Sequence, residues 1–168
     1  VYRAVRMIAE AAASVPWLLY DGAAEIDRHP LLDLLARPNR QQAGVAFREA
    51  LVGHLLVAGN AYVEAVELEG TVRELHTLRP DRMKVVPGSD GWPAGYEYTV
   101  GGRTVRFADP GEGGLAPILH LAFFHPLNDH YGFAPIEAAA TALDIHNAAA
   151  AWNKALLDNS ARPSGALV

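Results

Sequence analysis

Three histidines and an aspartate fall close together in the sequence and are its strongest candidates for metal chemistry. His120, His125, Asp129 and His130 lie within eleven residues, and imidazole and carboxylate groups are common ligands of zinc and iron. The histidines are five residues apart, across an expected strand end and a proline-containing loop, and no HExxH or HxH pair is present. Ordinary hydrogen-bonding roles are therefore favoured, and we expect no metal and no other cofactor. A metal-dependent enzyme that uses residues 120–130 is one alternative.

The sequence contains none of the common catalytic or phosphate-binding motifs. The sequence contains no G-x-S-x-G nucleophile elbow, no Walker phosphate loop and no dinucleotide fingerprint. Residues 111–114, Gly-Glu-Gly-Gly, carry an acid and lead into an expected strand, so no helix N-terminus would meet an anion there. Glu67 and Glu69 precede a turn, where a solvated strand face is the expected role. We therefore predict that the protein has no catalytic residues and is not an enzyme.

Composition restricts the compartment and the partners. The 168 residues suffice for one domain with a sizeable core. The chain has 14 Lys and Arg residues against 19 Asp and Glu residues, a formal net charge of −5. A domain that reads a nucleic-acid sequence needs clustered basic residues, so this class of protein is not expected. The chain has no cysteine, which excludes disulfides, thiolate metal sites and a cysteine nucleophile and fits an intracellular compartment. No apolar run is long enough to cross a bilayer, so no membrane partner is expected.

A long helix is expected after residue 134. Pro135 suits the first helical turn, where its missing N–H is not needed, and Glu137 complements the helix dipole. No Gly or Pro follows until Pro163, and alanine, the best helix former, fills much of the interval. We expect one helix from Pro135 to about Ser160, roughly 40 Å long at 1.5 Å per residue.

One face of this helix has apolar residues at alternating steps of four and three, the spacing of a coiled-coil seam. We call this set the seam; it consists of Ala138, Ala142, Ile145, Ala149, Trp152 and Leu156. The seam is mostly alanine, so a partner helix could approach closely. Two interpretations follow: an amphipathic helix that crosses the core of one domain, or a helix that packs beside copies of itself in an oligomer.

In the preceding sequence, helical patterns come first and strand patterns follow. Helices are expected at residues 1–13, 31–37 and 42–58, with a short strand at Trp17 to Tyr20. After Asn60 the apolar period changes from 3.6 to 2, and further strands are expected at 62–68, 72–78, 83–86, 96–100, 103–107 and 118–124. This segregated order predicts an α+β fold, with N-terminal helices, an antiparallel β meander and one long C-terminal helix.

Several short stretches, in a defined order and spacing, cover nearly the whole chain and together carry a resemblance. They are VYRAVRMIAEAAASVPWLLY, HPLLDLLARPN, LLVAGNAYVE, LHTLRPDRMKVV, ILHLAFFHP, YGFAPIEAA and NSARPSGALV. In this arrangement the chain resembles the portal proteins of tailed phages of the HK97 type, including those of phage-like gene transfer agents. Proteins of that family are considerably longer, so the resemblance implies an N-terminal fragment. It does not distinguish a phage from a gene transfer agent.

The resemblance implies a domain organisation and a structural function. Residues 1–128 would form a wing-like α+β domain, 129–160 a stem-like helix, and 161–168 the start of a truncated clip-like strand. Such a portal, or head–tail connector, forms a ring, usually dodecameric, at one capsid vertex, and phage DNA is packaged and ejected through its channel. The implied location is the virion, with the host cytoplasm during assembly. A non-viral α+β oligomerisation scaffold is a second alternative.

The resemblance also implies partners and a role for acidic residues of the long helix. The expected partners are further copies of the chain, the terminase large subunit, the major capsid protein, a head–tail adaptor and double-stranded DNA that passes without specific binding. Glu137, Asp144 and Asp158 are seven and fourteen residues apart, so they stay on nearly one helix face. Two roles are open for them: belts of negative charge that face the channel and repel DNA phosphates, or solvation of an outer face.

Overall fold

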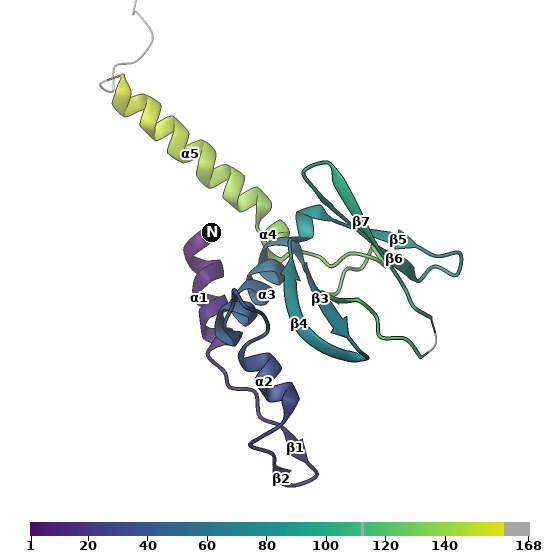
Figure 1. Ribbon diagram of the computed structural model, residues 1–168. Coiled ribbons are helices and arrows are strands. Elements are labelled where there is room, and N and C mark those ends of the chain that lie inside the picture. Colours follow the sequence, from purple (N-terminus) through teal and green to yellow (C-terminus); the bar gives the residue numbers. More distant parts are fainter. Residues whose placement is uncertain (112, 160–168) are drawn as a thin grey trace, which may run out of the picture. The chain divides into compact units, whose positions relative to one another are not determined.

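The computed structural model describes residues 1–111 and 113–159, which belong to two compact units, Val1–Ala134 and the chain from Pro135 onward. The helices are α1 (Tyr2–Ala13), α2 (Pro30–Ala36), α3 (Gly44–Ala58), α4 (Pro135–Ala138) and α5 (Ala140–Asp158) (Figure 1). The strands are β1 (Tyr20–Asp21), β2 (Ala24–Glu25), β3 (Asn60–Leu68), β4 (Thr71–Leu78), β5 (Met83–Pro87), β6 (Pro93–Val100), β7 (Arg103–Ala108) and β8 (Ile118–Ala122). The α+β class predicted from the sequence is confirmed.

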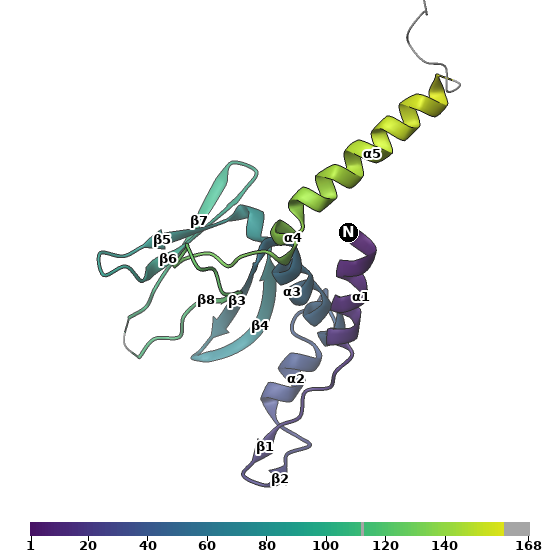
Figure 2. The same cartoon turned by 180° about the vertical axis from the view of Figure 1, so that it is seen from behind.

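The first unit has its helices on one side of a three-stranded sheet and a second three-stranded sheet on the other side (Figures 1 and 2). The first sheet has the order β4-β3-β8 and the second has the order β5-β6-β7, and all pairs are antiparallel. The expected strands therefore divide between two sheets instead of following one another in a single meander. A short 3₁₀ turn, η1 (Pro80–Arg82), separates β4 from β5, and β8 returns to pair with β3.

The central strand β3 explains this division, because its first half is buried on both faces. Tyr62 belongs to the cluster between the sheets, whereas its neighbours Ala61 and Val63, also buried, point to the opposite, helix-covered face. The cluster between the sheets comprises Tyr62, Leu78, Met83 and Ile118, with Tyr96, Tyr98 and Phe107 packed against it. The rings of Tyr62 and Tyr96 meet edge to face, with centroids 5.9 Å apart, which joins the two sheets.

The segment after α1 differs from the sequence expectation. The strand expected at Trp17 to Tyr20 is wrong: only Tyr20 belongs to a strand, in a small β1-β2 hairpin. Trp17 is instead held by a side chain of α3, because the Arg48 guanidinium lies over its ring, 5.2 Å from the centroid. The same guanidinium donates to the Ala13 carbonyl oxygen from Nε at 3.1 Å and from Nη2 at 2.8 Å. Arg48 therefore satisfies the C-terminal end of α1 and fixes it beside α3.

The second unit is helical but is not one regular helix. Residue Ala139 separates α4 from α5, with φ −98° and ψ 2°, and its N–H donates to the Ile136 carbonyl at the tighter three-residue spacing. The single helix expected from Pro135 is therefore wrong at this position, and the 19 residues of α5 span about 29 Å. The expected strand at 161–168 lies outside the described residues. Within the described ranges, no helix combines the length and the apolarity that crossing a bilayer demands.

Candidate functional site

The surface of α5 is the first candidate site, because the seam lies mostly on this helix. In the described chain no residue of α5 is buried, and the side chains of Ile145 and Trp152 are both 65% exposed. The described residues therefore give no support to the interpretation as a helix that crosses the core of one domain. Exposed large apolar side chains at regular spacing are typical of a surface that another helix covers.

The helix periodicity determines which seam residues share one face. The five seam residues of α5, from Ala142 to Leu156, fall within an arc of about 80° at 100° per residue. Ala138 lies on α4, beyond Ala139, so the period of α5 does not extend to it. The structure thus brings five of the six predicted packing residues together on one face of one helix.

The predicted acidic face is also divided by Ala139. Asp144 and Asp158 both lie on α5, and their separation of two heptads rotates them by about 40° on a straight helix. Glu137 belongs to α4. Asp158 forms an ion pair with Lys154, four residues earlier, and both side chains are exposed. No ion pair to Asp144 occurs in the part of the chain that the structure describes, so Asp144 carries the net negative charge of this face.

A second site lies in the first unit and was not singled out from the sequence: the hydrogen-bonded junction around Asn60. The Asn60 Oδ1 atom accepts from the Gly132 backbone N–H at 2.7 Å and from the His120 Nε2 atom at 2.9 Å. Its Nδ2 atom donates to the Ala58 carbonyl at 2.7 Å. One buried side chain therefore joins the end of α3, strand β8 and the loop that leads to Pro135. We call these residues, with Gly59, the Asn60 junction.

Two glycines make this junction possible. Gly59 ends α3 in the left-handed region, with φ 70°, and a Cβ atom there would lie 2.3 Å from the Gly132 carbonyl oxygen. A Cβ atom at residue 132 would lie 2.1 Å from the Gly59 carbonyl oxygen. The Gly59 carbonyl also accepts from the Phe123 N–H at 2.9 Å. Two backbones thus cross at a distance that only glycine at both positions allows.

Burial controls the titration of the junction. His120 stacks on Tyr62, with ring centroids 4.3 Å apart, and burial lowers the pKa of His120 to about 4. Because Asn60 Oδ1 accepts, the neutral imidazole carries its proton on Nε2. Burial likewise raises the pKa of Tyr62, whose hydroxyl is buried without a hydrogen-bond partner within the described ranges. His120 is therefore a neutral structural donor near pH 7.

The histidines between residues 120 and 130 have separate roles. His120 bonds to Asn60, while His125 packs edge to face on Phe133, and its Nδ1 accepts from the Leu127 N–H at 3.0 Å. Within the described residues, no group of three His, Cys, Asp or Glu side chains could hold a metal ion. The geometry therefore gives no support to the alternative of a metal-dependent enzyme in this region.

Comparisons with known proteins agree over the whole chain. A family model described as Phage portal protein matches residues 1–168. The chain is 55% identical to a protein in a structure of the neck of an empty gene transfer agent (GTA) particle that was computed with C6 symmetry. The TM-score is 0.86, and the match covers 99% of this chain and 44% of that chain. It is 57% identical to a protein in a structure of the neck of a native GTA particle that was computed with C12 symmetry. The TM-score is 0.83, and the match covers 98% of this chain and 43% of that chain.

Two relatives found by sequence also match the whole chain and are longer than it. An uncharacterized protein of Rickettsia bellii (strain RML369-C) is 37% identical over 171 residues, which cover all of this chain and 44% of that protein. A protein of Rickettsia felis (strain ATCC VR-1525 / URRWXCal2) is 36% identical over the same length. The chain therefore spans less than half the length of the relatives that it matches.

Proposed function

The chain belongs to the phage portal protein family, and we propose that it is part of a longer portal subunit that forms a ring at one vertex of a phage or gene transfer particle. The observation that carries this proposal is the identity of 55% and 57%, over nearly the whole chain, with proteins in structures of GTA necks that were computed with cyclic C6 or C12 symmetry. In this proposal the ring, dodecameric as the family resemblance implies, is a structural channel through which double-stranded DNA is packaged and ejected. The protein performs no catalysis of its own.

We propose that the seam on α5 contributes to contacts between subunits of the ring. A closed ring uses head-to-tail interfaces, in which one surface of each subunit meets a different surface of its neighbour. The seam supports this role because Ile145 and Trp152 are exposed apolar side chains on one helix face. Its alanines, Ala142 and Ala149, allow a neighbouring helix to approach closely.

Asp144 is the proposed channel-facing residue for which the structure gives the best support. It lies on the exposed helix α5, about 80° around the helix from Trp152 at the near edge of the seam, at 100° per residue. Repeated around a ring, this carboxylate would form a belt that repels DNA phosphates, whereas a belt of Lys or Arg would bind them by counterion release. Asp158 contributes less net charge because Lys154 pairs with it.

The remaining partners and locations belong to the same proposal. The proposed partners of the ring are those implied by the portal family. The terminase large subunit would dock on the ring, the major capsid protein would surround it, and a head–tail adaptor would close it. The subunit would be found in the host cytoplasm during assembly and in the virion afterwards. Residues 1–128 are proposed as wing-like, and the helical segment that follows, to residue 160, is proposed as stem-like.

A pair of matched charge substitutions tests this function. Ile145→Asp places a carboxylate in the seam, and Asn147→Asp places the same group on the opposite face of the exposed helix α5. In the longer portal subunit we expect Ile145→Asp to abolish ring formation and nuclease-protected DNA in particles, and Asn147→Asp to leave both unchanged. Light scattering measures the ring, and circular dichroism confirms that both variants fold. Normal rings and normal DNA content with Ile145→Asp would contradict the seam interface.

A further inference from the structure

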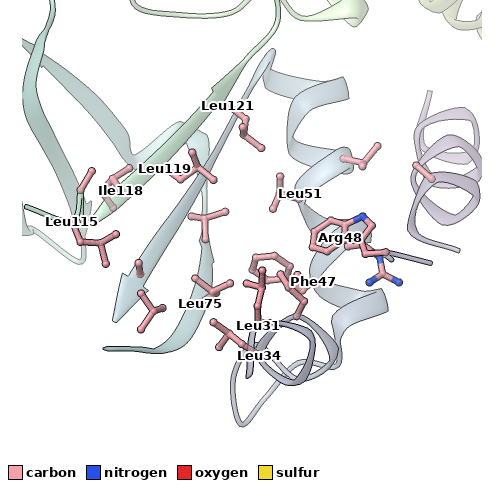
Figure 3. A pocket seen from close by; sticks show the side chains of 18 residues that line it. Leu31, Leu34, Phe47, Arg48, Leu51, Leu75, Leu115, Ile118, Leu119 and Leu121 are labelled. Atoms are coloured by element: carbon pink, nitrogen blue, oxygen red, sulfur yellow. The ribbon is translucent and has the colours of Figure 1, made fainter. Parts of the chain in front are cut away.

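The first unit contains an apolar cavity of about 600 Å³ that its own residues leave open. It lies between helices α2 and α3 and the helix-covered face of the sheet β4-β3-β8 (Figure 3). Its lining includes Phe47 and Leu51 of α3, Leu119 and Leu121 of β8, and Leu115, which precedes β8. Leu115 and Leu119 are 52% and 56% exposed, although they line a cavity that continues into buried core residues such as Phe47.

The cavity exists because one helix covers only part of a three-stranded sheet. Helix α3 packs on β3 and β4, and a helix with its side chains is about 10–12 Å wide, whereas neighbouring strands are about 4.8 Å apart. The outer strand β8 therefore has no helix above it in the described chain, and its leucines line the open space. A strand added at the free edge of β8 would extend the sheet but would not cover this face.

The chemistry of the lining excludes a small polar ligand as the occupant. Sites for small molecules combine apolar walls with a few polar groups that converge on the ligand. The charged residue in this lining is Arg48, and its guanidinium is already engaged by the Ala13 carbonyl and the Trp17 ring. An apolar lining of this kind is covered by protein in a stable molecule.

We infer that an apolar helix from the additional length of the portal subunit lies in this cavity beside α3 and covers β8. This inference rests on the proposed function, because more than half of each matched relative lies outside the match. A segment of the same subunit is favoured over a neighbouring copy, since the cavity is lined by Phe47, Val63 and Ile118 of the unit's own buried core. A helix at the usual packing distance of about 8–10 Å from α3 would lie above β8.

Thiol labelling of the longer subunit tests the inference, since residues 1–168 contain no cysteine and any native cysteine elsewhere would be replaced first. Leu119→Cys places a thiol in the cavity, and Val105→Cys on β7 is the matched control, because the two native side chains are 56% and 53% exposed. We expect a maleimide to react with the thiol at 119 at least about tenfold more slowly than with the control, because labelling then requires local opening. The labelling is measured in rings and in monomers of the Ile145→Asp variant.

The labelling outcomes test the helix in the cavity independently of whether the subunit forms a ring. Protection of the thiol at 119 in rings and monomers alike supports the intramolecular helix. Protection in rings alone would assign the cavity to a neighbouring subunit and overturn the inference. Equal labelling at 119 and 105 in both states would overturn it as well, and normal rings in the same sample would leave the proposed function intact. A thermal unfolding midpoint near that of the unmodified subunit confirms that the cysteine variants fold.

Discussion

The Asn60 Oδ1 atom lies 2.7 Å from the backbone nitrogen of Gly132, so a residue at the start of β3 holds the chain just before helix α4. This bond joins segments 72 residues apart in the sequence, and both partners are buried. The backbones of Gly59 and Gly132 cross in close contact beside this hydrogen bond. The junction therefore fixes the last residues of the first unit, from which the chain continues into α4.

Removing the Asn60 side chain should destabilise the first unit strongly. Asn60→Ala leaves the buried Gly132 N–H and the His120 Nε2–H without their acceptor, and we expect a loss of about 3 kcal/mol in the free energy of unfolding. The control is Asn153→Ala on the exposed face of α5, for which a change within about 0.5 kcal/mol is expected. Urea denaturation measures both. Equal midpoints for the two variants would show that the junction contributes little.

The sequence predicted the local features of this region but not the junction itself. The end of a helix at residue 58 and the start of a helix at Pro135 were predicted correctly, because both depend on local backbone preferences. The bond between Asn60 and Gly132 depends on a long-range crossing, for which a single sequence gives no pattern. The division into two sheets was also not predicted, because alternation shows that a strand is half-buried without showing its partner. The interruption at Ala139 has no sequence signal, since alanine favours a continuous helix.

The seam illustrates the same limit for the candidate site. The spacing of Ile145 and Trp152 correctly predicted that they share a helix face, because that follows from the helix period alone. The choice between a core-crossing and an exposed helix depends on what surrounds it, which the spacing does not contain. The pairing of Lys154 with Asp158 was available from their four-residue separation, and it reduces the negative charge first expected for this face.

Stability should fall as the pH decreases from about 6.5 to about 4, in part because of His120. Burial lowers the pKa of His120 to about 4 in the folded chain, whereas the unfolded value is near 6.5. Between these values the unfolded chain binds more protons, so the contribution of His120 is fully present above about pH 6.5 and decreases towards pH 4. His54, whose pKa burial also lowers, acts in the same direction.

His120→Gln keeps a donor for Asn60 and removes this titration. Urea midpoints measured at several pH values should therefore change less steeply for His120→Gln than for the unmodified protein, with a residual slope from His54. His146→Gln on the exposed helix α5 is the control and should keep the original slope. Identical slopes for the unmodified protein and His120→Gln would show that His120 is not neutral and buried as described.

Arg48 should stabilise the first unit through the end of α1. Arg48→Met keeps most of the side-chain length but removes both hydrogen bonds to the Ala13 carbonyl and the cation on the Trp17 ring. We expect a loss of about 1–3 kcal/mol in the free energy of unfolding. Arg40→Met is the control, because the Arg40 side chain is 95% exposed and pairs with Glu74 at 3.9 Å. Denaturation followed by tryptophan fluorescence compares them; an equal cost for both substitutions would contradict this role of Arg48.

Asp144 tests the proposed charge of the channel. Asp144→Lys in the longer subunit should leave ring formation unchanged but increase DNA retention by the ring and slow packaging, because a basic belt binds phosphates. The effect should weaken as salt increases, since the screening length is only about 8–10 Å near physiological ionic strength. His146→Lys, which adds a cation about 160° around the exposed helix α5 from Asp144, is the control. Unchanged retention and packaging at low and high salt would show that Asp144 does not face the DNA path.

The central claim, that this chain belongs to a ring-forming portal subunit, is tested most directly by electron microscopy of the purified longer protein. The account predicts closed rings of twelve subunits with a central channel and cyclic symmetry. Light scattering at the same concentration should give the mass of the whole ring. A protein that stays monomeric at high concentration, or that forms open filaments without a channel, would contradict the account.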